Sequence, residues 1–336
     1  MEKEMKVSII IPVYNVSAYI ERCIESVMRQ TYSNIECIIV DDATPDDSMV
    51  KCERLIDDYD GQIKFVILRH QKNRGMSATR NTGLDAATGD YIFFIDSDDE
   101  ITDDCIKKMA DIVLKDSTIE MVHGRWVRPS DNYSPHITRN YEPQLQIFDT
   151  KEAVRDFFYN AQGFFSFAVW NKLTRKDFLV NNKLYLQEGL KWEDYLWTFY
   201  LLKHLSHLYI IPDITYLYRK RPHSITTGTI AEESARHYAI IFEDITKNFT
   251  PGDEKREAKR WLKIFCEQYM ESSDKRKYRE LSKSFMDALQ EGRYLPEILW
   301  LRMTIFLSRI PFGKQLFRFA SILQDYTKRT KQKISQ

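Results

Sequence analysis

Four short, largely apolar runs near the start of the chain constrain its fold more than any other feature. They are Val7–Ile11, Ile35–Val40, Lys64–Leu68 and Tyr91–Ile95, and each has the length and the β-branched or aromatic content of a buried strand. Stretches with helical spacing of apolar residues separate them, as at 20–27. Strands that alternate with helices predict an α/β fold, a mostly parallel, doubly wound sheet with helices on both faces.

Polar or aromatic side chains follow three of these runs where each expected strand ends. Pro12 cannot donate to a sheet ladder, so it is expected to end the first strand and to release Tyr14 and Asn15. Asp41 follows the second run and Asp96 the fourth. Parallel strands bring these tips to one sheet edge, where open α/β sheets bind ligands. We expect a nucleotide site there, with Tyr14 stacking on a base, Asp41 accepting the imide N–H of a uracil, and Asp96 bonding a ribose hydroxyl.

The fourth run ends in Asp96-Ser97-Asp98-Asp99. Three acids this close repel one another in a low-dielectric cleft unless a cation or protons compensate. A hard divalent ion, Mn²⁺ or Mg²⁺, would compensate them and would bring phosphates with it, and Asp98 is the expected metal ligand. The alternative is an acidic turn or a helix N-cap, where aspartate is common.

The segment between the third and fourth runs carries a flexible Gly75, a helix-start Ser77 and a fixed cation, Arg80. Ser77 and the neighbouring N–H groups favour an anion at the start of a helix. Arg80 is expected to hold a phosphate or a carboxylate of the acidic cluster. The alternative is that Arg80 only braces the fold through an internal ion pair.

Composition sets the remaining bounds. With 336 residues, 43% of them hydrophobic, the chain can bury a sizeable core, and its equal numbers of basic and acidic residues do not point to nucleic acid as a partner. Five cysteines without a Cys-x-x-Cys pair fit a reducing compartment, so a cytoplasmic location is expected. No apolar run reaches the length of a spanning helix, and the apolar stretch at 7–13 reads as a strand and not as a signal peptide.

The strand–helix rhythm breaks after Asp99. Residues 100–115 have helical spacing, 120–127 resemble a further strand, and 130–143 read as a loop. An aromatic-rich stretch follows, which includes Trp170. Aromatic faces stack on sugar rings, but large aromatic residues also build cores.

Taken together, these segments resemble a family 2 glycosyltransferase of the GT-A fold, over roughly residues 5 to 225. The matching stretches are VSIIIPVYN at 7–15, IIVDDATPDDS at 38–48, NRGMSATRNTGLDAATGDYIFFIDSDD at 73–99, and a later Glu-Asp pair. One departure is visible, because such proteins commonly carry VDDGS and this chain has Ala43 in place of the glycine. Alanine tolerates fewer backbone conformations than glycine, so this turn is expected to differ.

The resemblance implies a role for several residues. It places Asp41 on uracil, Asp96 on the nucleoside, and Asp98 on the Mn²⁺ or Mg²⁺ that bridges the diphosphate. It makes Asp194 the base that takes the acceptor's proton, with Glu193 as a supporting acid. Without the upstream motifs, Glu193-Asp194 would read as an acidic pair that opens a helix.

Two further segments match the family's pattern. Trp170-Asn171-Lys172-Leu173 resembles a segment placed near the donor sugar and the acceptor, and 216–226 resembles its closing segment. The latter implies that Arg219 closes over the diphosphate and that His223 is an additional metal ligand. An ordinary surface histidine is the alternative for His223.

The chain is expected to divide at residue 228. Residues 1–228 would form the catalytic domain, with a nucleotide-binding half at 1–99 and an acceptor half at 100–228, and 229–336 would form a helical extension with a basic amphipathic tail. Residues 295–336 mix aromatic, aliphatic and basic side chains, and 301–336 hold eight basic residues against one acid. Such a segment is typical of a helix that lies in a membrane surface, and the alternative is a helix packed on the catalytic domain.

These features predict a metal-dependent, inverting glycosyltransferase. It would move a sugar from a UDP-sugar to a hydroxyl of a glycan or lipid-linked glycan in surface polysaccharide biosynthesis, at the inner face of the membrane if the tail binds lipid. One alternative is a binding protein that retains the nucleotide-sugar cleft without turnover. A sugar nucleotidyltransferase is a second, but it would need a Gly-rich, Lys-containing loop after the first strand, and 13–17 lacks one.

Overall fold

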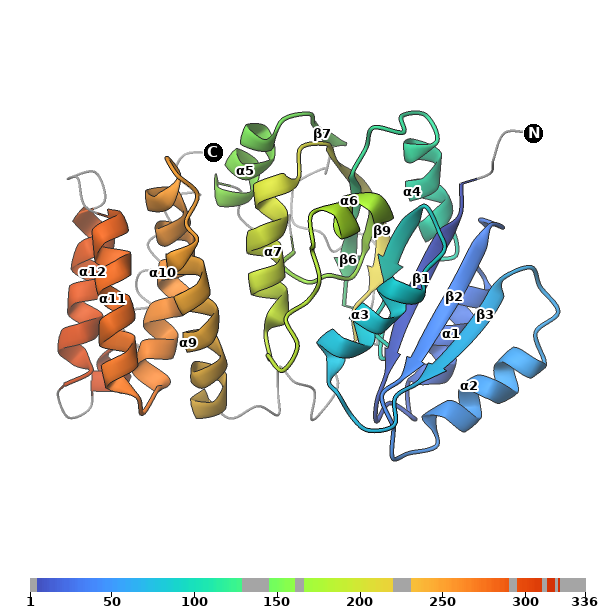
Figure 1. The fold of residues 1–336 in the computed structure, drawn as a ribbon, viewed down its shortest axis with the longest axis horizontal. Coiled ribbons are helices and arrows are strands. Elements are labelled where there is room, and N and C mark those ends of the chain that lie inside the picture. The colour runs from blue at the N-terminus through green and yellow to red at the C-terminus, as the bar shows by residue number, and fades with distance from the viewer. Residues whose placement is uncertain are drawn as a thin grey trace. The chain divides into compact units, whose positions relative to one another are not determined.

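The computed structural model describes residues 5–128, 145–160, 166–219, 231–289, 295–309, 313–317 and 320. The chain divides into two compact units, Met1–Thr227 and Gly228–Gln336. The first unit is a β-sheet flanked by helices, and the second is helical in the part that is described (Figure 1).

A single sheet of nine strands runs through the first unit, in the order β3-β2-β1-β4-β8-β6-β9-β5, with β7 paired to β9. Its first four strands in this order are parallel, as the sequence predicts, whereas β8 runs antiparallel to both β4 and β6. The strands are β1 (Val7–Val13), β2 (Ile35–Asp41), β3 (Lys64–Arg69), β4 (Tyr91–Phe94), β5 (Glu100–Ile101), β6 (Met121–Val127), β7 (Gln146–Phe148), β8 (Lys172–Arg175) and β9 (Leu208–Leu217).

Helices cover both faces of the sheet, because successive side chains of each strand point to opposite faces. Ile9 lies in a buried cluster with residues of α1, α2 and α4, while Ile10 lies in a second cluster with residues of α3, α5, α6 and α7. The helices are α1 (Ile20–Met28), α2 (Ser48–Asp57), α3 (Met76–Ala86), α4 (Cys105–Val113), α5 (Lys151–Asn160), α6 (Lys176–Asn181) and α7 (Glu193–His204). The predicted fold class, α/β with helices on both faces and a helical region after it, is confirmed.

Two boundaries differ from the sequence-based expectation. β1 does not stop at Pro12 but continues to Val13, where it pairs with Asp41 of β2. The last pair between β1 and β4 is Ile10 with Phe94, so at Pro12 the strand has only β2 beside it, and a proline is tolerated there. The expected helix at 100–115 is preceded by the two-residue strand β5, which pairs with β9.

The second unit contains α9 (Ala231–Lys247), α10 (Glu254–Glu271), α11 (Lys275–Leu289) and α12 (Leu295–Leu307), and 313–317 are also helical. Its core is rich in aromatic residues, with Trp261, Phe265 and Phe285 fully buried. Among the described residues, none of the helices is both long and apolar enough to cross a bilayer.

Candidate active site

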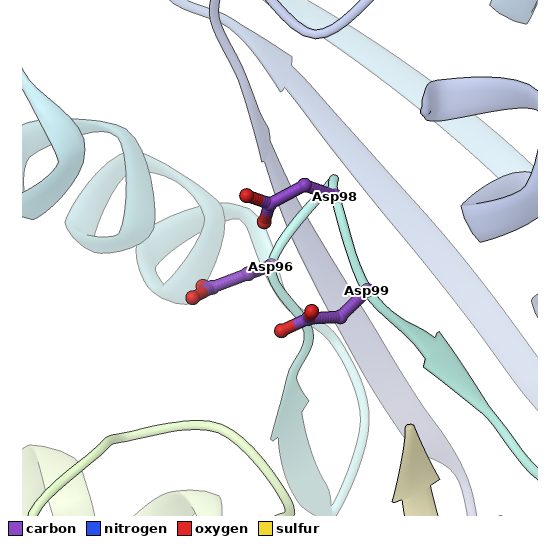
Figure 2. Close-up of side chains that lie close together, drawn as sticks. All are labelled: Asp96, Asp98 and Asp99. Carbon is purple, nitrogen blue, oxygen red and sulfur yellow. The ribbon is translucent and has the colours of Figure 1, made fainter. Parts of the chain in front are cut away.

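Three carboxylates meet at the carboxyl end of β4. Asp96, Asp98 and Asp99 follow the strand in a tight turn, in which Asp99 N donates to the Asp96 carbonyl (3.0 Å), and one oxygen from each acid lies within 4.8 Å of the others. Figure 2 shows the three side chains side by side on this turn. Asp96 and Asp98 are half-buried, whereas Asp99 is buried. The turn is acidic, as the sequence predicts, and it lies at the sheet edge where polar strand tips gather.

Asp99 is held from β9 and from the residues after it. Its Oδ2 accepts a hydrogen bond from the Tyr216 hydroxyl (2.7 Å), and its Oδ1 accepts one from Arg219 N (2.7 Å). The Tyr216 hydroxyl also accepts a bond from Asp96 N (3.1 Å). Burial, together with the charges of Asp96 and Asp98, raises the pKa of Asp99 to about 9. Sequence reasoning missed Tyr216, since only the fold brings β9 to this turn.

The acid cluster has the chemistry of a divalent-cation site. Its donors are carboxylate oxygens, which Mg²⁺ and Mn²⁺ prefer, and three acids converge on a small space. The raised pKa of Asp99 reports how unfavourable three negative charges are there without a counterion. A bound cation would relieve that repulsion, so these residues fit the ion. His223, the other expected ligand, lies outside the described residues.

Arg80 connects this cluster to a second pair of acids. It extends from α3 and is buried, with one terminal nitrogen donating to Asp96 Oδ1 (2.6 Å) and the other to Glu193 Oε1 (2.8 Å). The sequence predicted either a phosphate or a carboxylate as the partner of Arg80, and in the structure its two partners are the carboxylates of Asp96 and Glu193. Burial opposes the charge of Arg80, but the two acids outweigh it and raise its pKa. The guanidinium therefore fixes the start of α7 against the acidic turn.

Glu193 and Asp194 open α7, after Trp192 adopts a left-handed conformation (φ 64°). Glu193 is buried against Arg80. Asp194 is half-buried as a residue, but its Oδ1 is buried and has no hydrogen-bond partner among the described residues. Burial, followed by the charge of Glu193, raises the pKa of Asp194 to about 7. Asp194 thus combines the pKa of a general base with an unused acceptor oxygen.

A buried lysine interacts electrostatically with Asp194, although the sequence gave it no role of its own within the matching segment 170–173. Lys172 begins β8, and its Nζ donates to the carbonyls of Ser166 (3.0 Å) and Ala168. Burial lowers the pKa of Lys172 to about 7, and the charge of Asp194 opposes that shift. In a strand where polar and apolar residues alternate, the sequence does not show that a lysine is buried, because its burial depends on tertiary packing.

The expected base-binding residues lie at the ends of β1 and β2. Tyr14 is 44% exposed, whereas Pro12 is buried within β1. Asn15 has a left-handed conformation (φ 53°), and its N–H donates to the Thr44 hydroxyl (2.8 Å). Asp41 is buried except for a small exposed fraction and accepts a bond from Thr44 N (2.8 Å).

The turn after Asp41 keeps the backbone conformation that a glycine would take. Ala43 has φ 55°, in the left-handed region that alanine rarely adopts. Alanine therefore occupies a position whose backbone conformation favours glycine. Surrounding hydrogen bonds from Thr44 to Asp41 and Asp46 hold the turn in place.

Asp42 plays a distinct part, which sequence reasoning did not separate from that of Asp41. Its Oδ1 lies 2.6 Å from His70 Nδ1 and accepts a bond from Arg74 N (2.8 Å), and its Oδ2 accepts one from Gly75 N (2.8 Å). His70 Nε2 in turn lies 3.0 Å from the Thr82 hydroxyl of α3. We call these five residues the Asp42 clamp. It fixes the loop before α3 and the helix itself to the end of β2.

The clamp places the first turn of α3 beside the acids. Ser77 is buried, and its hydroxyl has no hydrogen-bond partner among the described residues. Gly75 supplies the left-handed turn (φ 88°) that lets the chain enter the helix. An unpartnered hydroxyl at a helix start is compatible with the anion that the sequence predicts.

Trp170 and Arg219 lie near the site in less direct ways. Trp170 is 8% exposed and stacks on Tyr216 (ring centroids 4.4 Å apart). The Arg219 side chain donates to Glu100 (2.5 Å), while its backbone bonds Asp99. The ring of Trp170 is therefore part of an aromatic layer next to the acids.

Comparisons with known proteins agree with this arrangement. The profile of Glycosyl transferase family 2 matches residues 8–176, half of the chain. Glycosyltransferase EpsJ of Bacillus subtilis, described as uncharacterized, is 30% identical over 224 residues, which cover 66% of this chain and 62% of EpsJ. Glycosyltransferase GlyG of Streptococcus pneumoniae serotype 4 is 30% identical over 246 residues, which cover 70% of this chain and 78% of GlyG.

A solved structure with the same fold is that of S. aureus TarS residues 1–349 in complex with UDP-GlcNAc. It superimposes with a TM-score of 0.71 at 18% identity and covers 94% of this chain and 92% of that one. At that identity the likeness concerns the fold, which is of the GT-A type. The profile match, the two relatives and the acidic turn after β4 lead to one conclusion. The chain is a member of glycosyltransferase family 2.

Proposed function

We propose that the protein transfers a sugar from a UDP-sugar to a hydroxyl group of a glycan or lipid-linked glycan, with inversion at the anomeric carbon. The observation that carries this proposal is the position of Arg80, which bonds Asp96 of the acidic turn and Glu193 of the α7 pair. Arg80 thereby joins the acids that suit a divalent cation to Glu193, which directly precedes the proposed base, Asp194.

Asp194 is the proposed general base. Inverting transfer requires a carboxylate to take the proton of the acceptor hydroxyl as its oxygen attacks the anomeric carbon. A base with a pKa near 7 is about half ionised at neutral pH and accepts a proton readily, and burial raises the pKa of Asp194 to about 7. Glu193, held by its ion pair with Arg80, would orient the acidic pair that opens α7.

The donor is proposed to lie along the carboxyl ends of β1, β2 and β4. Tyr14 and Asp41 would hold the uracil, and Asp96 the ribose. Ser77 and the first turn of α3 would face the diphosphate, and Trp170 and Arg219 would border the sugar and phosphates. The structure of TarS, which has the same fold, was solved with UDP-GlcNAc and supports the proposal of a uridine donor.

The acidic turn would hold Mn²⁺ or Mg²⁺, with Asp98 as the principal ligand and His223 as a second. When bound, that ion would neutralise charge that builds up on the departing diphosphate. Other elements of the chain hold two of the three acids in place: Tyr216 and the Arg219 backbone bond Asp99, and Arg80 bonds Asp96.

The biological setting is proposed from the relatives. EpsJ and GlyG are bacterial glycosyltransferases, and a role in surface polysaccharide biosynthesis at the cytoplasmic face of a membrane would suit such an enzyme. Residues 1–228 are proposed as the catalytic part, with 1–99 binding the nucleotide and 100–228 the acceptor.

Two other functions would use the same cleft. A binding protein without turnover would keep the nucleotide site but would not need a base of raised pKa, which Asp194 provides. A sugar nucleotidyltransferase would need a Gly-rich, Lys-containing phosphate loop after β1, and Tyr14-Asn15-Val16 does not provide it.

The test is UDP release from a panel of UDP-sugars with Mn²⁺ or Mg²⁺, with wild type, Asp98→Ala and Asp194→Asn. Slow hydrolysis of a donor does not require the acceptor to be known. We expect release from one sugar that stops on addition of a chelator, is lost in Asp98→Ala and falls by about a hundredfold or more in Asp194→Asn. Lys107→Ala, at an exposed site on α4, is the matched control and should behave as wild type.

UDP binding on the same samples separates the alternatives. Metal-dependent binding without release, even with glycan acceptors added, would favour the binding protein. If the protein binds no uridine compound, the proposal that the donor's nucleobase is uracil would be refuted.

A further inference from the structure

The helix α12 packs beside α11 in the second unit (Figure 1), and it has one buried and one exposed side. On its inner side, Leu301 and Thr304 are fully buried and Leu307 is nearly so, where the helix packs in the second unit with α10 and α11. On its outer side, Leu299 is 54% exposed and Phe306 is 61% exposed. Burial of one side thus leaves large apolar side chains on the other, where solvation by water is unfavourable.

Two arginines lie on that outer side. Arg302 falls between Leu299 and Phe306, and Arg309 follows in the turn after the helix, so the four positions are spaced by three or four residues and share one side. Both arginines are exposed, and neither has an ion pair among the described residues. We call Leu299, Arg302, Phe306 and Arg309 the α12 outer face.

The charge of the outer face is not offset within the helix. The acid of α12, Glu297, is half-buried and pairs with Lys259 of α10 (3.2 Å). The sequence after Arg309 holds six further basic residues and one acid. The partner that suits this face must accept apolar side chains and must carry negative charge.

We propose that the α12 outer face binds the surface of an anionic lipid bilayer, with the helix lying in the plane of that surface. Leu299 and Phe306 enter the boundary between head groups and acyl chains, and the two arginines reach the phosphates beside them. A negative leaflet attracts such residues and strengthens a contact that two apolar side chains alone would make weakly. This inference does not rest on the proposed function, since it concerns a separate unit and a separate ligand.

The experiment is co-sedimentation of the full chain with phosphatidylcholine vesicles that contain or lack phosphatidylglycerol, without donor or metal. We expect binding to the anionic vesicles that weakens as salt is raised. Leu299→Ser/Phe306→Ser should reduce the partition coefficient by about tenfold or more. Arg302→Gln/Arg309→Gln should reduce binding several-fold to anionic vesicles, and it should remove most of the salt dependence.

Matched controls come from the same unit. Ile240→Ser replaces an apolar residue of α9 that is 53% exposed, and Lys283→Gln removes an exposed charge of α11. Both should bind vesicles as wild type does, and all variants should keep the wild-type melting temperature, because the replaced side chains are exposed.

Three outcomes would overturn the proposal. The first is that the wild-type protein does not sediment with anionic vesicles. The second is that the outer-face variants bind these vesicles as well as the control variants do. The third is a wild-type dimer that Leu299→Ser/Phe306→Ser turns into a monomer with unchanged vesicle binding, which would make the face a contact between copies of the chain. UDP binding, measured in parallel, reports on the proposed function alone.

Discussion

At the scale of single residues, Asp194 determines how activity should depend on pH. Its pKa is raised to about 7 by burial and by Glu193, and only the ionised form accepts a proton. We expect kcat/KM to rise about tenfold per pH unit below that value and to level off above it. Asp194→Asn should lower the rate by about 10²–10⁴ and remove this rise. If kcat/KM of the wild-type protein does not change between pH 5 and pH 8, Asp194 is not the general base.

The same raised pKa affects stability in the opposite direction. An unfolded aspartate titrates near 3.9, so between about 4 and 7 the folded chain binds the proton more tightly than the unfolded chain does. Stability attributable to Asp194 is therefore greatest at low pH and is lost as pH rises through that window. Asp194→Asn should accordingly have a higher melting temperature than wild type above neutral pH, and the difference should shrink as the pH falls. Differential scanning calorimetry across that range measures it.

Ala43 is a second residue whose conformation yields a prediction. A left-handed φ of 55° is strained for alanine and relaxed for glycine. Ala43→Gly should raise the free energy of unfolding by about 1 kcal/mol, despite the greater entropy of the unfolded chain. The matched control is Ala86→Gly at the exposed end of α3, which should lower it by up to about 1 kcal/mol. Urea denaturation of both variants decides the matter, and equal losses would contradict the role of strain.

At the scale of elements, the Asp42 clamp explains how the loop before α3 is held. Asp42→Ala would leave three partly buried donors, from His70, Arg74 and Gly75, without their acceptor. Each such loss costs about 1–3 kcal/mol, so we expect a destabilisation of about 3 kcal/mol or more. Asp57→Ala, at an exposed site on α2, should stay within about 0.5 kcal/mol of wild type. Chemical denaturation that finds the two variants alike would show that the clamp does not hold this loop.

The elements also reveal what local patterns can predict. The four runs near the start of the chain became β1 to β4 with boundaries shifted by one or two residues. The apolar content of β1, β2 and β4 reflects burial on both faces, whereas β3, at the edge of the sheet, is partly exposed and not buried as expected. The missing N–H of Pro12 alone predicts a strand end. In the structure β4 ends before it reaches Pro12, so the proline has only β2 as a neighbour and is tolerated within β1. The pairing of β5 with β9 could not be predicted, since a two-residue strand has no periodicity.

The site follows the same division. The acidic turn could be located from residue type, because three carboxylates directly after a buried strand repel one another unless a cation or protons compensate. The link from this turn to the Glu-Asp pair could not be predicted, since Arg80 was equally suited to a phosphate or a carboxylate until α7 was placed beside α3. Tyr216 and Lys172 fall in segments that match the family's pattern, but the sequence assigned neither a role, because their burial and contacts depend on the folded chain.

At the scale of the whole molecule, the two compact units predict that the chain can be divided. Both buried clusters of the sheet lie within residues 5–216, and the aromatic core of the second unit lies after residue 231. A fragment of residues 1–227 therefore keeps its entire core, and we expect it to unfold cooperatively by circular dichroism and calorimetry.

The same fragment tests how the activities are distributed. The described residues proposed to bind the nucleotide lie before 220, so the fragment should bind UDP with Mn²⁺ within about threefold of the full chain, since the removed unit contributes none of them. It should fail to sediment with anionic vesicles, because α12 is absent. A fragment that aggregates, or that unfolds without a transition, would show that the helical unit completes the catalytic fold. A folded fragment that binds vesicles as well as the full chain does would instead transfer the membrane contact to the first unit.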